Sequence, residues 1–562
     1  MTNVVTVVKK VNYSESSLSL LKNNQSELLT DFPTVYFVYD KKNEEYTVYV
    51  GETNNVFRRT KQHFIEPRDD WQQLNASQSA QMLVFGNEFS NKSVTLDLEN
   101  KFMNYFLGVP SIKNDKGINN RRGNPQGKYY PKDKIDAIFK EGWKRLNQEE
   151  PDLFPDIKVI ENSALFKSSP FKTLSESQQN AQNQIIMKIE EAVSQEKETL
   201  ILVTGSAGSG KTVLLSNVFY NLQLESKEDD NVLLKGKKAF VLVNHNEQLS
   251  VYQQISRKLG LNENQVMKPN SFLKKYENEK VDIVIVDEGH LLATRNGQAF
   301  PKKYGLTQLE ALRKISKIVV LVFDEYQILT GGQYVDPNTI LELKHEANLE
   351  NKLIELHDQH RMQMSTATNN WLNDFIWNHE IDQIPHDDKY ELKIFDNPTD
   401  LYNGIKEKSN DTEYGLSRML ASYDWDWKSD GQKWCVEINN FSLPWNYYYT
   451  KASDSTPWAE NPDSIKEVGS TFTIQGFDLN YAGVIIGPSV KYNPQDKKIF
   501  FDADGSKNKK AIEKKHGIDA INHNLNNELN VLLTRGVHGL YICACDESLQ
   551  KALLEAQKGN KQ

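Results

Sequence analysis

Short apolar runs separated by polar segments dominate the C-terminal two thirds of the chain. The runs are rich in Val, Ile and Leu, and they read "TLILVTG", "AFVLVNH", "VDIVIVDE", "KIVVLVFDE", "AGVIIG" and "GLYICAC". The segments between them read as helices, and continuous apolar runs between helices are typical of parallel sheets covered on both faces. The pattern predicts an α/β architecture.

The N-terminal part has a different pattern. Residues 34–53, "TVYFVYDKKNEEYTVYVGET", read as two strands joined by a charged turn. The stretches "NNVFRRTKQHF" and "SVTLDLENKFMNYFLG" then predict helices. Residues 149–171 are rich in Pro, Ser and charge, which is typical of a linker. We therefore expect a small α/β domain over residues 1–148, a linker over 149–171, and a larger α/β part after it.

Composition narrows the class of protein. A chain of 562 residues predicts three or four domains, at roughly 150 residues per domain. The net charge of -9 argues against wholesale electrostatic attachment to nucleic acid or to an anionic membrane, but it leaves room for local basic grooves. The three cysteines form no CxxC pair, which suits a reducing compartment. No apolar run is long enough to span a bilayer, so we expect a cytoplasmic protein without a membrane partner.

A glycine-rich loop follows the first apolar run. The stretch "GSAGSGKT" begins at Gly205 and fits G-x-x-x-x-G-K-[ST] between a predicted strand and a predicted helix. Gly205, Gly208 and Gly210 let backbone N–H groups close around phosphate oxygens. Lys211 supplies a positive charge and Thr212 a magnesium ligand. A chance glycine turn is the alternative, but strand, loop and helix stand in the required order. We expect ATP and Mg²⁺ as cofactors.

Two carboxylates end the third apolar run. In "VDIVIVDEGH", Asp287 and Glu288 stand where the carboxyl end of a strand would meet the nucleotide. Asp287 would hold the magnesium shell, and Glu288 would orient or deprotonate the attacking water. Acidic residues also end strands because they are solvated there. The presence of Lys211 in the same chain favours the nucleotide interpretation.

These motifs and the stretches around them resemble a superfamily 1 DNA/RNA helicase core, in particular the Schlafen group 3-type DNA/RNA helicase domain. "LSESQQNAQ" resembles the adenine-reading Q motif, with Gln178 at the reading position. "FDEYQ" resembles motif III, with Gln327 sensing the γ-phosphate, and "QHRM" resembles motif IV, with Arg361. "TFTIQGFDLNYAGVIIG" resembles motif V. "LNVLLTRGVHGLYIC" resembles motif VI, where Arg535 would be the arginine finger.

The helicase resemblance implies two RecA-like P-loop domains with parallel sheets, over residues 172–350 and 351–562. An aromatic-rich stretch, 401–461, falls in the second of them and contains "YDWDWKSDGQKW" and "LPWNYYY". Its side chains could stack on bases, or they could form the core of an insertion.

The N-terminal strands resemble the signature tripeptides of GIY-YIG endonucleases, over roughly residues 33–130. "VYF" and "YVG" place Tyr36 and Tyr49 at the two signature tyrosines, with Thr34 where the first Gly is usual. Arg59 stands where the family has its catalytic arginine, and His63 follows one helical turn later on the same face. Ordinary packing in a sheet would explain any one of the tyrosines, but not the whole set together.

Glu99 lies within the second predicted helix of this region. Its helical neighbours are Thr95, Leu96, Phe102, Met103 and Phe106. The carboxylate would therefore lie on an apolar stripe, where a bare charge is costly. A metal ligand explains this position, and Glu is the metal-binding residue of the family at the corresponding place. The alternative is a solvated Glu99 that only flanks the stripe.

The GIY-YIG resemblance also implies a reaction. A tyrosine phenolate or His63 would take a proton from water, magnesium on Glu99 would polarise the phosphate, and Arg59 would stabilise the transition-state charge. Asn119 or Asn120 would contact the phosphate. Arg121, Arg122 and Lys128 would add a basic edge.

Together the two resemblances predict a metal-dependent endonuclease fused to an ATP-driven helicase or translocase. The expected partner is nucleic acid, with DNA favoured over RNA, and the expected setting is bacterial defence or nucleic-acid processing. Two alternatives stay open. The N-terminal domain could bind nucleic acid without cutting it, or the ATPase could be a switch that acts on a protein partner.

Overall fold

The computed structural model describes most of the chain. The described residues are 5–17, 27–65, 69–118, 126–205, 208–227, 231–294, 307–356, 362–411, 414–428, 430, 432–446 and 457–558. The chain divides into two compact units. Unit 1 contains residues 1–175, 213–237 and 250–266, and unit 2 contains residues 176–212, 238–249 and 267–562.

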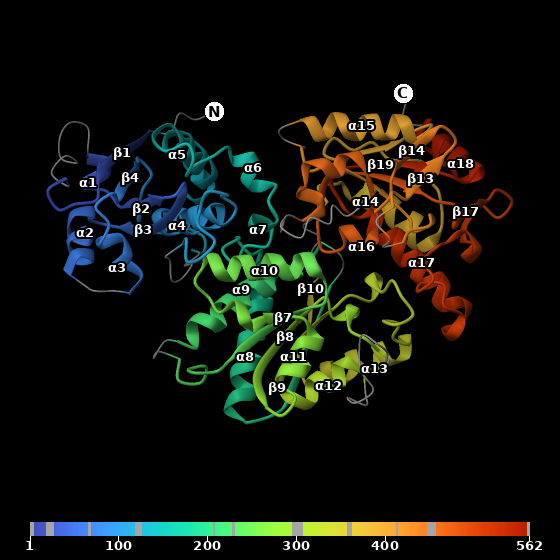
Figure 1. Cartoon of the computed structure of the whole chain (residues 1–562), viewed down its shortest axis with the longest axis horizontal. Helices are drawn as coiled ribbons and strands as arrows, with labels where there is room; N and C mark the ends of the chain where they lie inside the picture. The colour runs from blue at the N-terminus through green and yellow to red at the C-terminus, as the bar shows by residue number, and fades with distance from the viewer. Residues whose placement is uncertain are drawn as a thin grey trace. The chain divides into compact units, whose positions relative to one another are not determined.

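Unit 1 is built around an antiparallel sheet with the strand order β1-β4-β2-β3 (Figure 1). The strands are β1 (Thr6–Asn12), β4 (Gln81–Asn87), β2 (Thr34–Lys42) and β3 (Glu45–Thr53). β2 and β3 form the hairpin that the pattern predicts, and its turn residues Asn43 and Glu44 have φ of 51° and 65°. Positive φ at both positions suits a two-residue turn between twisted strands. The register places Tyr36 opposite Gly51, where an added Cβ would lie 2.5 Å from the Tyr36 ring.

Helices surround the sheet of unit 1. They are α1 (Glu27–Thr30), α2 (Val56–Ile65), α3 (Asp69–Asn75), α4 (Lys92–Leu107), α5 (Ile135–Glu149), α6 (Ile157–Glu161) and α7 (Ala164–Lys167). α4 begins after Asn91, whose side chain accepts a hydrogen bond from Val94 N. Phe102 and Phe106 of α4 pack edge-on against Phe37 of β2. This aromatic contact holds the helix that carries Glu99 against the sheet.

The segment 149–171, expected as a linker, contains α6 and α7. Both helices pack on α4. The Tyr105 hydroxyl of α4 donates to Glu161 Oε1 at 2.6 Å, and the Tyr105 ring lies edge-on to Phe166. These contacts make the segment part of the core of unit 1.

A buried lysine lies at the end of α4 in unit 1. Lys258, the last residue of α10 (Asn246–Lys258), donates to Leu107 O at 3.1 Å and to Val109 O at 2.8 Å. Burial lowers the pKa of Lys258 to about 8. The carbonyl groups at the end of a helix carry partial negative charge, so the ammonium group stabilises this end of α4.

The first sheet of unit 2 has the strand order β10-β5-β9-β8-β6-β7. The strands are β10 (Leu353–Leu356), β5 (Thr199–Gly205), β9 (Ser316–Phe323), β8 (Val281–Asp287), β6 (Ala239–Val243) and β7 (Val266–Met267). Pairing is parallel from β10 through β6. The helices of this part are α8 (Glu176–Ser194), α11 (Pro269–Lys275), α12 (Gln308–Ile315) and α13 (Pro337–Leu349). α9 (Lys211–Glu225) and α10 begin in unit 2, whereas their residues 213–225 and 250–258 belong to unit 1. β6, β8 and β9 are buried almost throughout, as strands covered on both faces should be.

A second parallel sheet follows in unit 2, with the order β11-β19-β16-β12-β15. Its strands are β11 (Glu391–Ile394), β19 (Gly536–Ala544), β16 (Leu479–Ile486), β12 (Arg418–Ala421) and β15 (Val468–Gly469). The helices are α14 (Thr366–Asn373), α15 (Pro398–Asn410), α16 (Thr471–Ile474), α17 (Gly517–Leu533) and α18 (Glu547–Lys558). Two hairpins accompany the sheet, β13 (Cys435–Ile438) with β14 (Phe441–Pro444) and β17 (Val490–Asn493) with β18 (Lys498–Phe501).

Part of the aromatic-rich stretch packs into the core of this second part, while Tyr447, Tyr448 and Tyr449 lie outside the described residues. Trp445 is fully buried in a cluster with residues of β12, β13 and β16, and Trp425, Trp427 and Trp434 pack against that cluster. A fully buried ring such as Trp445 cannot stack on bases, whereas the other three rings are half-buried. The burial of Trp445 therefore supports the core interpretation for the described part of residues 401–461. Across the part of the chain that the structure describes, no helix has the length and apolar character needed to cross a membrane.

Candidate active sites

The phosphate-binding loop lies at the carboxyl end of β5 and leads into α9. Gly208 and Gly210 have φ of 87° and 78°, a region that favours glycine. A Cβ on Gly210 would lie 2.1 Å from Gln178 Nε2. Gln178 is buried and its Nε2 donates to Ser209 O at 2.9 Å. The loop conformation therefore depends on glycine and on a glutamine that supports it from α8.

Lys211 makes a buried ion pair. Its Nζ donates to Gly205 O at 2.7 Å and to Asp324 Oδ2 at 2.9 Å. Burial by itself raises the pKa of Asp324, but the Lys211 charge and the neighbouring hydrogen bonds outweigh it and hold this pKa below its ordinary value. Asp324 directly follows β9, so two neighbouring strands bring the lysine and the aspartate together.

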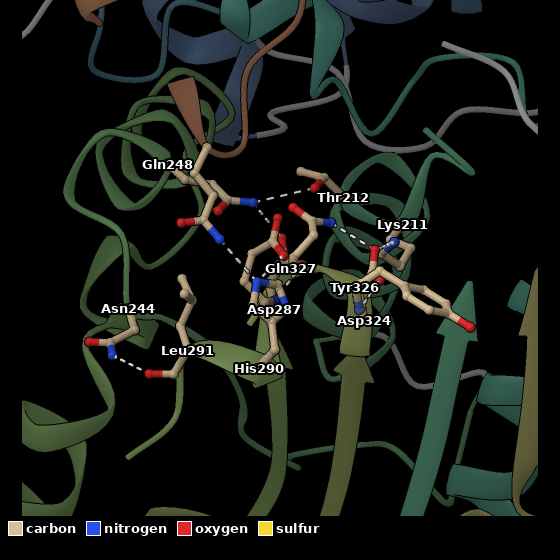
Figure 2. A network of polar contacts seen from close by, with 12 residues as sticks. Lys211, Thr212, Asn244, Gln248, Asp287, His290, Leu291, Asp324, Tyr326 and Gln327 are labelled. Atoms are coloured by element: carbon tan, nitrogen blue, oxygen red, sulfur yellow. Dashed lines mark hydrogen bonds and ion pairs between the residues drawn. The ribbon is translucent and has the colours of Figure 1, made fainter. Parts of the chain in front are cut away.

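The network continues from Asp324 to the second sheet of unit 2. Gln327 Nε2 donates to Asp324 Oδ2 at 2.7 Å, and Arg535 Nη2 donates to Gln327 Oε1 at 3.3 Å. Arg535 is 1% exposed and also donates to Val531 O and Phe477 O. Figure 2 shows Lys211, Asp324 and Gln327 pointing toward one another. Residues that are far apart in the sequence thus form one polar chain from the loop to Arg535.

The two carboxylates at the end of β8, Asp287 and Glu288, are buried beside this network. Asp287 Oδ1 accepts from Glu288 N at 3.0 Å, and Asp287 Oδ2 accepts from Gln248 Nε2 at 2.7 Å. Glu288 has a φ of 51°, in the left-handed region that residues other than glycine rarely adopt. Its Oε2 lies 3.4 Å from His290 Nε2. Burial lowers the pKa of His290, so the imidazole is neutral at pH 7.

A second candidate site lies in unit 1, where β2, β3, α2 and α4 meet. The Tyr36 hydroxyl lies 2.8 Å from His63 Nε2, and both residues are buried. The Tyr36 and Tyr49 rings have centroids 6.0 Å apart, and Arg59 interacts with both hydroxyls. Burial, with a smaller contribution from Tyr49, raises the pKa of Tyr36 well above its usual value. The phenol therefore stays protonated at neutral pH.

Glu99 of α4 lies close enough to Tyr36 and Arg59 to interact with them electrostatically. Burial first, and then the charge of Glu52, raise the pKa of Glu99 to about 8. Glu52 Oε2 accepts from Thr95 Oγ1 at 3.2 Å, and Glu52 Oε1 is paired with Lys92 Nζ. No hydrogen bond or ion pair from the described residues reaches the Glu99 carboxylate. Two acidic side chains thus face one region, where Lys92 pairs with Glu52 and the charges of Lys92 and Arg59 only partly offset the burial of Glu99.

In comparisons with known proteins, two families match different parts of the chain. The family described as "Schlafen group 3, DNA/RNA helicase domain" matches residues 198–546. This chain belongs to that family. The description "GIY-YIG catalytic domain" matches residues 32–107. A relative from Saccharomyces cerevisiae (strain ATCC 204508 / S288c), "Uncharacterized protein YPL245W", is 34% identical over 437 residues, with 71% of this chain and 94% of the relative covered.

The matches confirm the predicted fusion, a GIY-YIG domain followed by a Schlafen group 3 helicase domain with parallel sheets. The geometry also brings many of the predicted site residues together. Lys211 and Gln327 both bond Asp324. The Tyr36 hydroxyl contacts both His63 and Arg59. Arg361 lies outside the described residues, as do Asn119, Asn120, Arg121 and Arg122. Lys128 is exposed.

The helicase domain offers oxygen ligands that suit Mg²⁺. Thr212 Oγ1 and Asp287 Oδ2 lie 3.3 Å and 2.7 Å from the same Gln248 Nε2, so both oxygens face one point. Hydroxyl and carboxylate oxygens are the ligands that Mg²⁺ prefers, with substrate phosphates completing its shell. Within the described ranges no group of three or more His, Cys, Asp or Glu side chains could hold a metal. The two oxygens of Thr212 and Asp287 fit a Mg²⁺ whose other ligands come from phosphate and water.

Sequence reasoning missed several residues of these sites. Gln248, in "NHNEQL", and His290, in "DEGH", contact the two acidic residues after β8. Glu52 and Lys92 lie near Glu99. None of them lies at a sequence spacing that indicates its role, although the position of His290 directly after "DEG" could have suggested a contact with the carboxylates.

Proposed function

We propose that this chain is an ATP-driven helicase or translocase fused to a metal-dependent endonuclease that cuts nucleic acid, with DNA favoured over RNA. The observation that carries the ATPase half is the chain of contacts Lys211–Asp324–Gln327–Arg535. It joins the phosphate-binding loop to the residue expected to stabilise the transition state. A role in defence or in nucleic-acid processing remains a prediction.

In the ATPase reaction, the loop N–H groups and Lys211 bind the phosphates. Lys211 then exchanges Asp324 for phosphate oxygen, and Gln327 keeps Asp324 hydrogen-bonded. Mg²⁺ on Thr212 and Asp287 would neutralise phosphate charge. Glu288 orients or deprotonates the water, and Arg535 stabilises charge that develops on the phosphoryl group.

In the nuclease reaction, His63 is the better base, because the raised pKa of Tyr36 disfavours a phenolate. Tyr36 orients the imidazole through the contact at 2.8 Å. Arg59 lies beside both tyrosines and is placed to stabilise the extra negative charge of the transition state. A metal on Glu99 would polarise the phosphate.

The experiment that tests this function uses labelled single- and double-stranded DNA and RNA with magnesium, with and without ATP. Cleavage that requires metal, and ATP turnover that nucleic acid stimulates, are the expected results. Binding without cleavage would favour an N-terminal binding module. ATP turnover that no nucleic acid stimulates would favour a switch that acts on a protein.

A further inference from the structure

Gln248 of α10 is a buried amide with its two ends in different surroundings. Its Nε2 lies 2.7 Å from Asp287 Oδ2 and 3.3 Å from Thr212 Oγ1. Its Oε1 is buried and has no hydrogen-bond partner among the described residues. Figure 2 shows Gln248 reaching the two oxygens from one side. An amide has donors at one end and an acceptor at the other, so the two ends cannot substitute for each other.

The oxygen end faces the segment between α16 and β16. A Cβ built on Gly476 would lie 3.4 Å from Gln248 Oε1, and Gly476 has a φ of 86°. The neighbouring Gln475 places its Nε2 3.1 Å from His290 Nε2, and His290 Nε2 lies 3.4 Å from Glu288 Oε2. The pair Gln475–Gly476 is therefore linked to both carboxylates at the end of β8. Gln248 lies between Gly476 and Asp287, and His290 lies between Gln475 and Glu288.

Other residues at the start of α10 hold the same two segments together. His245 Nε2 lies 3.2 Å from Phe472 O, and Glu247 Oε1 accepts from Trp458 N at 3.3 Å. Gln248 is thus in a turn whose neighbours already contact residues 458–476. The Gln248 side chain is only 3% exposed, so a change in its conformation must alter its contacts with protein groups and not with solvent.

We propose that Gln248 is a positioning residue that couples magnesium at Thr212 and Asp287 to the Gln475–Gly476 segment by reversal of its side-chain amide. A cation on these oxygens repels the N–H donors that now face them. Rotation of the amide turns its oxygen toward the cation or its bound water. The same rotation brings the Nε2 donors of Gln248 to the side of Gly476, where the Oε1 acceptor now lies. This inference rests on the proposed Mg²⁺–ATP site.

The test uses the full chain and a fluorescent ATP analogue that is hydrolysed slowly. One readout is the Mg²⁺ concentration at half-maximal analogue binding. The other is hydrogen exchange of residues 470–478, with analogue plus Mg²⁺ compared with analogue plus EDTA. The variants are Gln248→Leu and Gln248→Glu. The control is Gln254→Leu on the same helix, where Gln254 bonds Ser250 Oγ at 3.0 Å.

In the wild type we expect exchange in residues 470–478 to respond to Mg²⁺. Gln248→Leu should raise the Mg²⁺ concentration at half-maximal analogue binding about tenfold, because the loss of one hydrogen bond weakens binding by about that factor. It should also lose the exchange response. Gln248→Glu has oxygens at both ends, so it should need no more Mg²⁺ than the wild type and should still lose the response. Gln254→Leu should behave as the wild type.

Two outcomes overturn the proposal separately. A normal exchange response in either Gln248 variant, or a wild-type Mg²⁺ requirement in Gln248→Leu, removes the role of Gln248 while the ATP site stands. Failure of the wild type to bind the analogue with Mg²⁺ overturns the proposed function, and this inference with it. If Gln248→Leu does not fold, the exchange response of Gln248→Glu alone decides.

Discussion

The two candidate sites satisfy their charged groups in different ways. In the ATPase site the buried Asp324 is paired with Lys211 at 2.9 Å and is hydrogen-bonded by Gln327. In the candidate site of the GIY-YIG domain Glu99 lies near a second acidic residue, Glu52, and near Lys92 and Arg59, but receives no hydrogen bond or ion pair from the described residues. A buried carboxylate with its own counter-charge is stable without ligand, whereas a half-buried carboxylate with no ion pair among the described residues can be stabilised by an added cation. The comparison predicts opposite stability effects when the two sites are mutated.

The largest effect is expected at Lys211. Lys211→Ala should reduce ATP turnover to background, because the phosphates lose their positive charge. It should also lower the free energy of unfolding by about 3 kcal/mol, since buried Asp324 loses its cation. Turnover assays and denaturant melts check both effects. The control is Lys211→Met with Asp324→Asn, which should recover stability but not turnover. Unchanged stability in Lys211→Ala would mean that the ion pair with Asp324 does not stabilise the folded chain.

Glu99→Ala should abolish strand cleavage and spare the ATPase activity that nucleic acid stimulates. Its melting temperature without added metal should be no lower than that of the wild type, because a half-buried acid beside Glu52 is removed. Any stabilisation by Mg²⁺ that the wild-type nuclease domain shows should be lost. Nicking, ATP turnover and melting are measured on one preparation. Cleavage at the wild-type rate would reduce the GIY-YIG domain to a binding module.

Arg535→Ala should slow ATP hydrolysis on the order of a thousandfold at saturating ATP, with a smaller change in ATP binding. An arginine finger acts mainly on charge that develops in the transition state. Because Arg535 also donates to Val531 O and Phe477 O, Arg535→Lys serves as a control that keeps a buried cation. Weak binding with normal turnover at saturation would contradict the assigned role.

The smallest effect on activity is expected at Glu528 of α17, a buried acid that accepts hydrogen bonds from Tyr423 N and Thr471 Oγ1. Burial, and then the charge of Asp424, raise the pKa of Glu528 from 4.5 to about 8. The folded state therefore holds this proton more tightly than the unfolded state. Its stabilising contribution is full below pH about 4.5 and is lost as the pH rises through about 8, by at most about 1.4 kcal/mol per pH unit. Glu528→Gln should flatten this part of a stability curve measured by denaturant melts. An equally steep curve would place the titration elsewhere.

Several features were predictable because they are local in the sequence. The phosphate-binding loop needs only a strand, glycines and a helix in succession, and the β2–β3 hairpin needs two apolar runs around a short turn. Other features were not. Composition suggested a linker over 149–171, whereas α6 and α7 pack on Tyr105 of α4, a partner that composition cannot reveal. The four-residue edge strand β10 is too short to leave a pattern.

The sequence by itself determined the order of the domains, the identity of the phosphate-binding loop and the spacing of Tyr36, Tyr49, Arg59 and His63, since each follows from neighbouring residues. Only the tertiary structure decided that Lys211 pairs with Asp324, that Gln248 touches Asp287 and Thr212, and that Glu52 lies near Glu99. These contacts join residues that are far apart in the chain and meet only where strands and helices end together. Burial and pKa belong to the surroundings of a group, and the packed fold creates those surroundings.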